Sequence, residues 1–345
     1  MRIRRSLPIL IGVLLVAGAV ALVVVLRKHA PPEPARLLPG ADGFVYIDLK
    51  WMRRAGLMGN LPQVSHDPEY EQFIQATGIE AERDLEEAAL AIHYPPNVAG
   101  AHGEELRFSE VLVGHFQAER LTTYLKKTAS SVESYRSTEI YSIPLEDRTV
   151  RVAVLAVNTV AASNVADPLV IRGIIDRSRK LASPFGGPAL LRQYYKEVPL
   201  ASLAWAVLRM NPGFDTSGAG VLSWSFLFPK PAVVVASARY LGSVHLKAAA
   251  FTDNPEDAAQ LSQKVGAFLN LFRTAQNTTS ASGTDSDVKA LFDSLKVEQA
   301  KNRTVVTAVA PIGFINKILS EGPTTAPPQP TEPPPAPPPA KGKKR

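Results

Sequence analysis

Apolar positions along this chain follow three successive patterns: one continuous run, a long stretch of alternating and helical spacings, and a Pro-rich end. The continuous run is residues 8–26 (PILIGVLLVAGAVALVVVL), 19 residues with no charged side chain. At 1.5 Å per residue a helix of this length measures about 28 Å, which matches a bilayer hydrocarbon thickness of about 30 Å. The run therefore predicts a transmembrane helix.

The charges around this run predict its orientation. Arg2, Arg4 and Arg5 precede it, and Arg27 and Lys28 follow it, so the bias is slight but favours a cytoplasmic N-terminus. A cleavable signal peptide has a shorter apolar core followed by a small-residue cleavage site. We therefore expect an uncleaved, single-pass signal anchor in the inner (cytoplasmic) membrane. Residues 1–7 would then be cytoplasmic, and the body would lie in the periplasm.

Between the two ends, the chain alternates short β-rich runs with amphipathic helices. Residues 27–40 are Pro-rich and predict a spacer that separates the body from the bilayer. Asp67-Pro68 and Asp167-Pro168 each place an N-cap before a proline at the first helical position. In a first unit, residues 41–180, the pattern predicts strands at 44–49, 88–94, 109–116, 137–143, 148–157 and 160–163, and helices at 67–77, 117–129 and 167–180.

The second half repeats this order after a hinge at residues 181–200, which contains LASPFGGP. In residues 201–320 we expect strands at 202–210, 221–228, 232–239, 243–251, 294–299 and 303–309, and helices at 254–273, 287–292 and 311–320. Residues 146–154 also match residues 301–309, with Arg148 aligned to Arg303. The sequence therefore predicts an α+β fold with an internal repeat: two similar units, each a mainly antiparallel sheet covered by helices on one face.

The C-terminal end, residues 321–345, predicts a disordered tail. Residues 323–340 contain ten prolines in 18 positions and no aliphatic side chain larger than alanine, so they cannot bury enough apolar surface to fold. Lys341, Lys343, Lys344 and Arg345 end the chain. Two interpretations stay open: a basic tip that contacts anionic lipid or acidic envelope polymers, and a dispensable solubilising tail.

Charge and cysteine content exclude several classes of function. The net charge of +6 is carried by residues 1–40 and 321–345, and the body between them has a net charge of −1. No basic face for nucleic acid is therefore expected. The absence of cysteine excludes disulfides, thiol catalysis, Cys-ligated metal centres and an acylated lipoprotein anchor.

Several short sequence segments are similar to those of a known group of proteins. They are residues 38–49 (LPGADGFVYIDL), 66–70 (HDPEY), 76–79 (ATGI) and 82–86 (ERDLE). The chain resembles uncharacterised exported proteins with a single anchor from acidobacteria-type bacteria, a family of unknown function. The resemblance covers most of the body and implies a location in the cell envelope. It supplies no activity.

The histidines give two weak candidates for chemistry. His102, with Glu104 and Glu105, offers a nitrogen and two carboxylates as metal ligands, but we expect this segment to be a solvated loop. His93 and His115 lie on consecutive strands that we expect to pair, so their side chains would meet. Alternation places His115 in phase with Val111 and Val113, which predicts a partly buried, hydrogen-bonded histidine.

Other residue types give no assembled signature. Ser183 lies in the predicted hinge with no histidine or acid tied to it. Glu86-Glu87, Glu104-Glu105, Asp285 and Asp287 are acidic groups that nothing places across a cleft, and Gly218-Ala-Gly220 lacks the remainder of a phosphate loop. Trp205 and Trp224 lie in predicted strands, and we expect both side chains to pack in the core. No catalytic, cofactor-binding or metal-ligating residue is nominated.

These patterns favour a membrane-anchored, extracytoplasmic protein of unknown activity, which binds or scaffolds an envelope protein or polymer in a groove between its halves. An exported hydrolase with a dispersed site is the first alternative, and a Ser/His/acid group or two facing carboxylates would favour it. The second alternative is a carrier of an apolar ligand, held in a dry cavity between two sheets.

Overall fold

The computed structural model describes residues 30–57, 66–94, 107–145, 148–179, 187–211, 227–279 and 286–320. The predicted anchor, the Gly218 loop, His102, Ser183, Trp224 and the Pro-rich tail lie outside these residues. Within them, no helix combines the length and the apolar character that crossing a bilayer requires.

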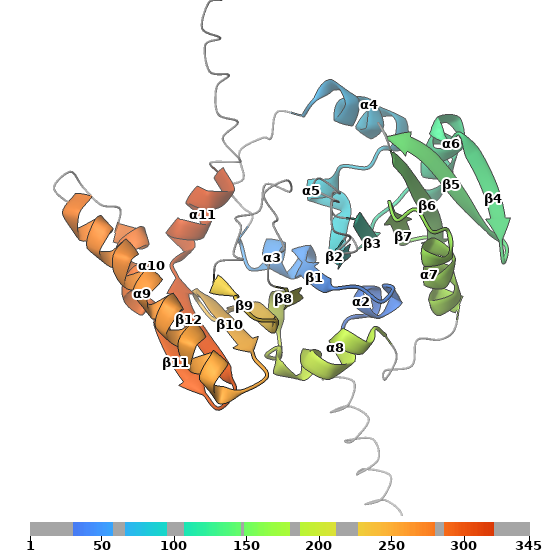
Figure 1. Cartoon of the computed structure of the whole chain (residues 1–345). Helices are drawn as coiled ribbons and strands as arrows, with labels where there is room; N and C mark the ends of the chain where they lie inside the picture. Colours follow the sequence, from blue (N-terminus) through green and yellow to red (C-terminus); the bar gives the residue numbers. More distant parts are fainter. Residues whose placement is uncertain are drawn as a thin grey trace, which may run out of the picture.

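All described strands belong to one 12-stranded antiparallel sheet (Figure 1). Its order is β11-β12-β10-β9-β8-β1-β2-β3-β7-β6-β5-β4. The strands of the first half are β1 (Gly43–Asp48), β2 (Leu85–His93), β3 (Arg107–Gly114), β4 (Ser131–Tyr135), β5 (Thr138–Leu145), β6 (Arg148–Ala156) and β7 (Thr159–Ser163). Those of the second half are β8 (Ser202–Met210), β9 (Ala232–Tyr240), β10 (Val244–Phe251), β11 (Lys296–Ala300) and β12 (Arg303–Ala310).

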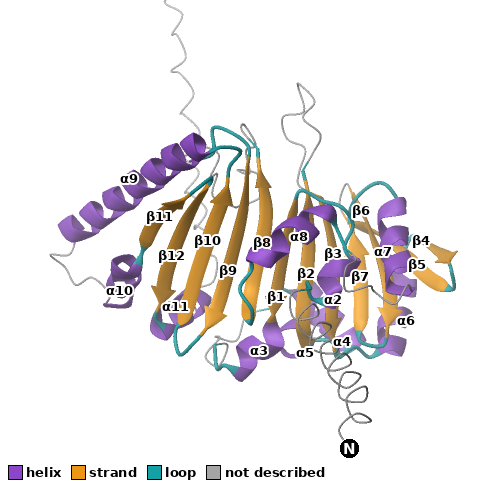
Figure 2. Cartoon of the chain, turned by 90° about the horizontal axis from the view of Figure 1, so that it is seen from below, coloured by secondary structure: helices purple, strands orange, loops and turns teal. Residues whose placement is uncertain are grey.

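Helices cover both faces of the sheet (Figure 2). One face carries α2 (Glu33–Leu37), α7 (Leu169–Arg179), α8 (Ala189–Tyr194) and the 3₁₀ turn η1 (Tyr195–Glu197), and we call it the α2 face. The opposite, or α4, face carries α3 (Leu49–Arg54), α4 (Pro68–Thr77), α5 (Ala81–Asp84), α6 (Ala118–Thr128), α9 (Pro255–Thr279), α10 (Ser286–Ser294) and α11 (Ile312–Ser320).

Strand alternation divides the core between these faces. On β7, Ala161 packs into the main core under α2, α7 and α8, whereas its neighbour Val160 packs under α4 and α6 on the other face. Phe251 and Ala250 divide in the same way on β10. Because successive strand side chains point to opposite faces, a sheet that is covered on both faces needs apolar residues at consecutive positions.

Local sequence signals set several element boundaries as predicted. Asp67 caps α4 by accepting a hydrogen bond from the Tyr70 amide at 2.7 Å, and Pro68 occupies the first turn. Helix α4 ends at Gly78, whose φ of 74° lies in the left-handed region that glycine adopts without strain. Strands β6, β8, β9, β10 and β12 and helices α6, α7 and α9 also lie where the periodicity predicted them.

The α+β class and the mainly antiparallel pairing are confirmed, but two details differ. Strand β1 pairs with β8, with Tyr46 opposite Trp205, so the strands form one sheet where two were expected. Helices lie on both faces of that sheet, where one covered face was expected. Within the described part of the chain no second sheet faces this one, so the cavity between two sheets that would signal an apolar-ligand carrier is not formed there.

Two segments predicted as connectors pack into the body. The expected spacer at 27–40 contains α2, and Leu37 and Leu38 are only 3% and 1% exposed. The expected hinge at 181–200 contains α8, whose Leu191 is fully buried. Proline and glycine marked both stretches as linkers, but their few leucines pack against the sheet.

Candidate functional site

An open cleft of about 300 Å³ lies at one end of the first half of the sheet. It forms where the end of α4, the end of α5, the segment after β3 and the turn between β6 and β7 meet. The described residues that line it are Gly78, Arg83, Asp84, Gly114, His115, Phe116, Gln117, Val157 and Asn158. All of them belong to the first half, so this cleft is not the groove between halves that the sequence predicted.

Backbone hydrogen bonds hold the floor of the cleft together. The Asp84 carbonyl accepts from the His115 amide at 2.9 Å, and the Asn158 carbonyl accepts from the Gly114 amide at 3.0 Å. A Cβ atom at Gly114 would press against the Asp84 carbonyl oxygen and lie 3.1 Å from the Leu85 Cα. Glycine at 114 therefore allows β3 to approach the start of β2 closely enough to bring the two sides of the cleft together.

Arg120 fixes the wall made by α4. Its guanidinium donates to the Ala76 carbonyl at 3.1 Å and to the Gln75 carbonyl at 2.5 Å, which satisfies carbonyl groups at the end of α4. It also donates to the Gln117 side chain at 3.3 Å. A Cβ at Gly78 would come within 2.7 Å of Arg120 Nη1, so a larger side chain there would displace this wall.

Two acids lie within electrostatic range of His115: Asp84, which lines the cleft, and Glu86, which does not. Hydrogen bonds from Arg83 to the Asp84 carboxylate, at 2.8 and 2.7 Å, hold the pKa of Asp84 below its usual value, against the opposing effect of burial. The Lys50 ammonium lowers the pKa of Glu86 in the same way. A charge on His115 lowers both carboxyl pKa values further, so this imidazole lies within electrostatic range of two acids.

The cleft has the composition of a binding site. The polar and charged lining residues are Arg83, Asp84, His115, Gln117 and Asn158, and the apolar ones are Phe116 and Val157. The volume is at the lower end of the range of small-molecule sites, about 300–1,000 Å³. No serine, threonine or lysine is among its described lining residues. The arrangement favours recognition of a small polar group over nucleophilic catalysis.

A serine–histidine contact occurs elsewhere, on the α2 face. His93 Nε2 lies 3.0 Å from Ser109 Oγ, which lies 2.9 Å from Ser163 Oγ. Burial lowers the pKa of His93, and Ser109 is fully buried. The nearby Asp42 carboxylate instead accepts from the Tyr94 amide at 3.2 Å. This network satisfies buried polar groups, and none of the described cavities opens onto Ser109.

A second, partly buried group contains two carboxylates on neighbouring strands. Asp48 and Glu87 are cross-strand partners on β1 and β2, and the Tyr46 hydroxyl donates to Glu87 at 2.9 Å. Burial raises the pKa of Glu87, and the negative charge of Asp48 adds to this effect. Asp48 also caps α3, and Tyr46 stacks on Trp205 with ring centroids 5.5 Å apart. These contacts stabilise the junction of the two halves.

The structure places the histidines differently from the prediction. His93 pairs with Arg107, whereas His115 follows Gly114 at the other end of β3, so the expected His93–His115 contact is wrong. His115 is exposed because β3 ends at Gly114 and alternation no longer applies beyond it. Trp205 is buried, as predicted. The described residues contain no cluster of three metal-ligating side chains.

The cleft could not be predicted from the sequence because the residues that line it belong to four separate segments of the chain. Gly114, between a β-rich run and a helix start, was the one local signal of close backbone approach. Arg120 and Gln117 were interpreted only as helix positions.

Comparisons with known proteins give no family. No protein-family model and no curated protein matches the chain. Among solved structures, crystal form III of TP0453 is 10% identical over 84% of this chain and 99% of that chain, with a TM-score of 0.45. Crystal form I of TP0453 is 10% identical over 85% and 98% of the two chains, with a TM-score of 0.43. The function of this chain is therefore inferred from its own residues.

Proposed function

We propose that this protein is a membrane-anchored, extracytoplasmic binding protein that recognises a small polar unit of a cell-envelope component in the cleft at His115. The observation that carries the proposal is the cleft itself, about 300 Å³ and open, with five polar or charged residues along its lining. That volume accommodates a group the size of an amino acid or a monosaccharide. Because the cleft is open, a longer polymer can continue out of it.

The proposed location rests on the sequence. Residues 8–26 would form a single-pass anchor in the inner membrane, with the N-terminus in the cytoplasm and the body in the periplasm. An anchored body outside the cytoplasm meets envelope polymers and envelope proteins. The near-neutral body gives no reason to expect nucleic acid as a partner.

We also propose that the sheet arose from two similar units, 41–180 and 201–320. Strand order supports this: the halves run outward from the centre as β1-β2-β3-β7-β6 and β8-β9-β10-β12-β11. In the first half the third strand from the centre, β3, pairs with β7, and in the second half the third strand from the centre, β10, pairs with β12. β7 and β12 are the last strands of their halves along the chain. The nine-residue match, however, aligns β6 with β12, whereas the strand order relates β7 to β12. The support therefore comes from topology and not from that match.

Two matched variants of the full chain in a non-ionic detergent test the binding site. Val157→Trp enlarges a 77% exposed side chain on the lining of the cleft, and Leu241→Trp enlarges a 64% exposed side chain on another hairpin turn. The probes are free amino acids, amino sugars and soluble fragments of the cell-wall polymer, tested by calorimetry and melting temperature.

We expect at least one probe to bind the wild type and Leu241→Trp equally, and Val157→Trp at least about tenfold more weakly. Equal binding to Val157→Trp would place the ligand elsewhere. If no probe binds the wild type, the small polar unit is the wrong ligand class.

A further inference from the structure

The cation on the lining of the cleft is already paired with two acids. Arg83 donates to the two carboxylate oxygens of Asp84 at 2.8 and 2.7 Å. It also donates to Glu80 Oε2 at 2.9 Å and to the Gly78 carbonyl at 3.1 Å. A ligand carboxylate would therefore have to displace one of the two acids in order to bind this guanidinium through two parallel hydrogen bonds.

The other ionisable groups of the lining offer no free charge either. Asp84 is the one carboxylate among the described lining residues, and its Oδ2 accepts a further hydrogen bond from the Glu80 amide at 2.9 Å. An ammonium group would therefore find this carboxylate already engaged. His115 carries a charge only when it is protonated, and Asp84 and Glu86 are then the acids within electrostatic range of it. The cleft is not built to select a carboxylate or an ammonium group.

Two neutral amides supply free hydrogen-bond donors. Gln117 is the N-cap residue of α6, and its Oε1 accepts from Arg120 Nη1 at 3.3 Å. Asn158 lies in the turn between β6 and β7, and its Oδ1 accepts from the Thr159 hydroxyl at 3.1 Å. Within the part of the chain that the structure describes, neither amide nitrogen has a hydrogen-bond partner. Because each oxygen already accepts a hydrogen bond, the NH₂ group is the part of each amide that is left to bind a ligand.

The two amides reach the cleft from different elements. A Cβ on Gly78 would lie 3.0 Å from Gln117 Nε2, so this amide lies beside the end of α4. Asn158 lies beside the end of β3, because its carbonyl accepts from the Gly114 amide at 3.0 Å. Apolar surface is added by the partly buried Phe116 and the exposed Val157, which also line the cleft. A ligand in the cleft therefore meets two neutral donors and apolar carbon.

We propose that the cleft binds an uncharged, N-acetylated amino sugar of an envelope polysaccharide, and that Gln117 and Asn158 determine this specificity. The inference rests on the binding site of the proposed function and names its ligand class. Every hydroxyl and acetamido oxygen accepts hydrogen bonds, so a sugar unit presents an acceptor to both amides. It carries several such oxygens for its single N–H, whereas a peptide unit carries one N–H donor for every carbonyl. The acetyl methyl group and the C–H face of the ring pack on Phe116 and Val157.

Selectivity among small probes tests the ligand class on the wild-type protein. The full chain is kept in a polyoxyethylene detergent, because detergents with sugar headgroups would compete, and binding is measured by calorimetry. The probes are N-acetylglucosamine, glucosamine, free alanine and N-acetylalaninamide, the last of which is uncharged and acetylated but has no sugar ring. We expect N-acetylglucosamine to bind at least about tenfold more tightly than each of the other probes, because a site that donates hydrogen bonds rejects ligands that leave those donors unpaired.

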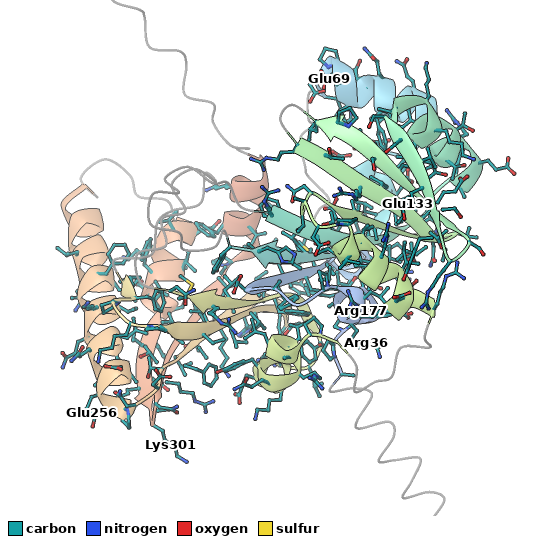
Figure 3. All side chains as sticks on the ribbon, turned by 45° about the vertical axis from the view of Figure 1, so that its right-hand side comes forward. Arg36, Glu69, Glu133, Arg177, Glu256 and Lys301 are labelled. Atoms are coloured by element: carbon teal, nitrogen blue, oxygen red, sulfur yellow. The ribbon has the colours of Figure 1, made fainter. Side chains whose placement is uncertain are left out.

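Two isosteric variants test the amides. Asn158→Asp and Gln117→Glu each keep the oxygen that accepts a hydrogen bond within the protein, remove an NH₂ donor and add a negative charge. Gln72→Glu makes the same change at an exposed position on α4, three residues after Glu69, which is labelled in Figure 3, and is the control. We expect each cleft variant to bind N-acetylglucosamine at least about tenfold more weakly, and Gln72→Glu to bind it as the wild type does. Glucosamine, a cation, should bind the cleft variants no more weakly than it binds the wild type.

Three results would overturn the sugar assignment: another probe that binds as tightly as N-acetylglucosamine, unchanged affinity in either cleft variant, or an equal loss in Gln72→Glu. If the binding of such a probe is still lost in Val157→Trp, the site of the proposed function stands with a different ligand. If no probe binds the wild type, the proposed function fails together with this inference. Because the two amides lie on separate elements, a folding defect in one variant, detected by its melting temperature, leaves the other variant as the test.

Discussion

Glu110 is a carboxyl group in the middle of β3 on the α4 face, and replacing it with leucine tests how the sheet tolerates a partly buried charge. Its cross-strand partners are Leu90 and Ala162, which offer no hydrogen bond through their side chains. No hydrogen bond or ion pair of its side chain occurs within the described part of the chain. Burial raises the pKa of Glu110, and no described charge contributes to this shift.

The sign of the effect follows from that shift. A raised carboxyl pKa in the folded protein means that folding favours the protonated form, so the penalty is absent below the unfolded pKa of about 4.3 and grows as the pH rises through the folded pKa. An unsatisfied buried polar group costs about 1–3 kcal/mol, and more if it is charged. At pH 8 we expect Glu110→Leu to raise the free energy of unfolding by about 1–3 kcal/mol, with a gain that shrinks toward pH 4.

Urea unfolding of the full chain in a non-ionic detergent, followed by tryptophan fluorescence, to which the buried Trp205 contributes, measures this difference at pH 4, 6 and 8. Glu298→Leu, the same substitution at an exposed position on β11, is the control and should change stability by less than about 0.5 kcal/mol. A gain for Glu110→Leu that is the same at all three pH values, or a loss of stability at pH 8, would refute the reasoning.

Three further predictions concern the cleft and the core. Gly114→Ala forces a methyl group against the Asp84 carbonyl oxygen and should lower stability by about 1–3 kcal/mol in urea unfolding; an unchanged midpoint would contradict the close approach. Because Arg83 lowers the pKa of Asp84, we expect Asp84→Asn to be less stable than the wild type above the unfolded pKa of about 3.9. The difference in stability should disappear as the pH falls through the lower pKa of Asp84 in the folded protein. A difference that grows in acid would contradict this role of Arg83. Leu191→Ala, on α8, should cost about 2–5 kcal/mol by the same measurement, whereas a loose hinge would lose almost nothing.

How far the sequence could predict the fold depended on how local each signal was. The strand 202–210 and the helix that begins at Pro68 were predictable because alternation, an N-cap and a proline act within a few residues. Strand β4 (Ser131–Tyr135) was missed because it is exposed on both sides and shows no apolar alternation. Helix α2 was missed because its few leucines lie among prolines, and only packing against the sheet makes it part of the core.

The sequence by itself determined the α+β class, the antiparallel strands, the expectation of an anchor at residues 8–26 and the classes of chemistry that the absence of cysteine removes. Only the tertiary structure decided that β1 pairs with β8 to join the strands into one sheet, that β3 separates His93 from His115, and that Gly78, Asp84, Gly114 and Asn158 meet at one cleft. Periodicity reports which face of an element is buried. It does not say which distant element covers that face, and a site assembled from four segments depends on those pairings.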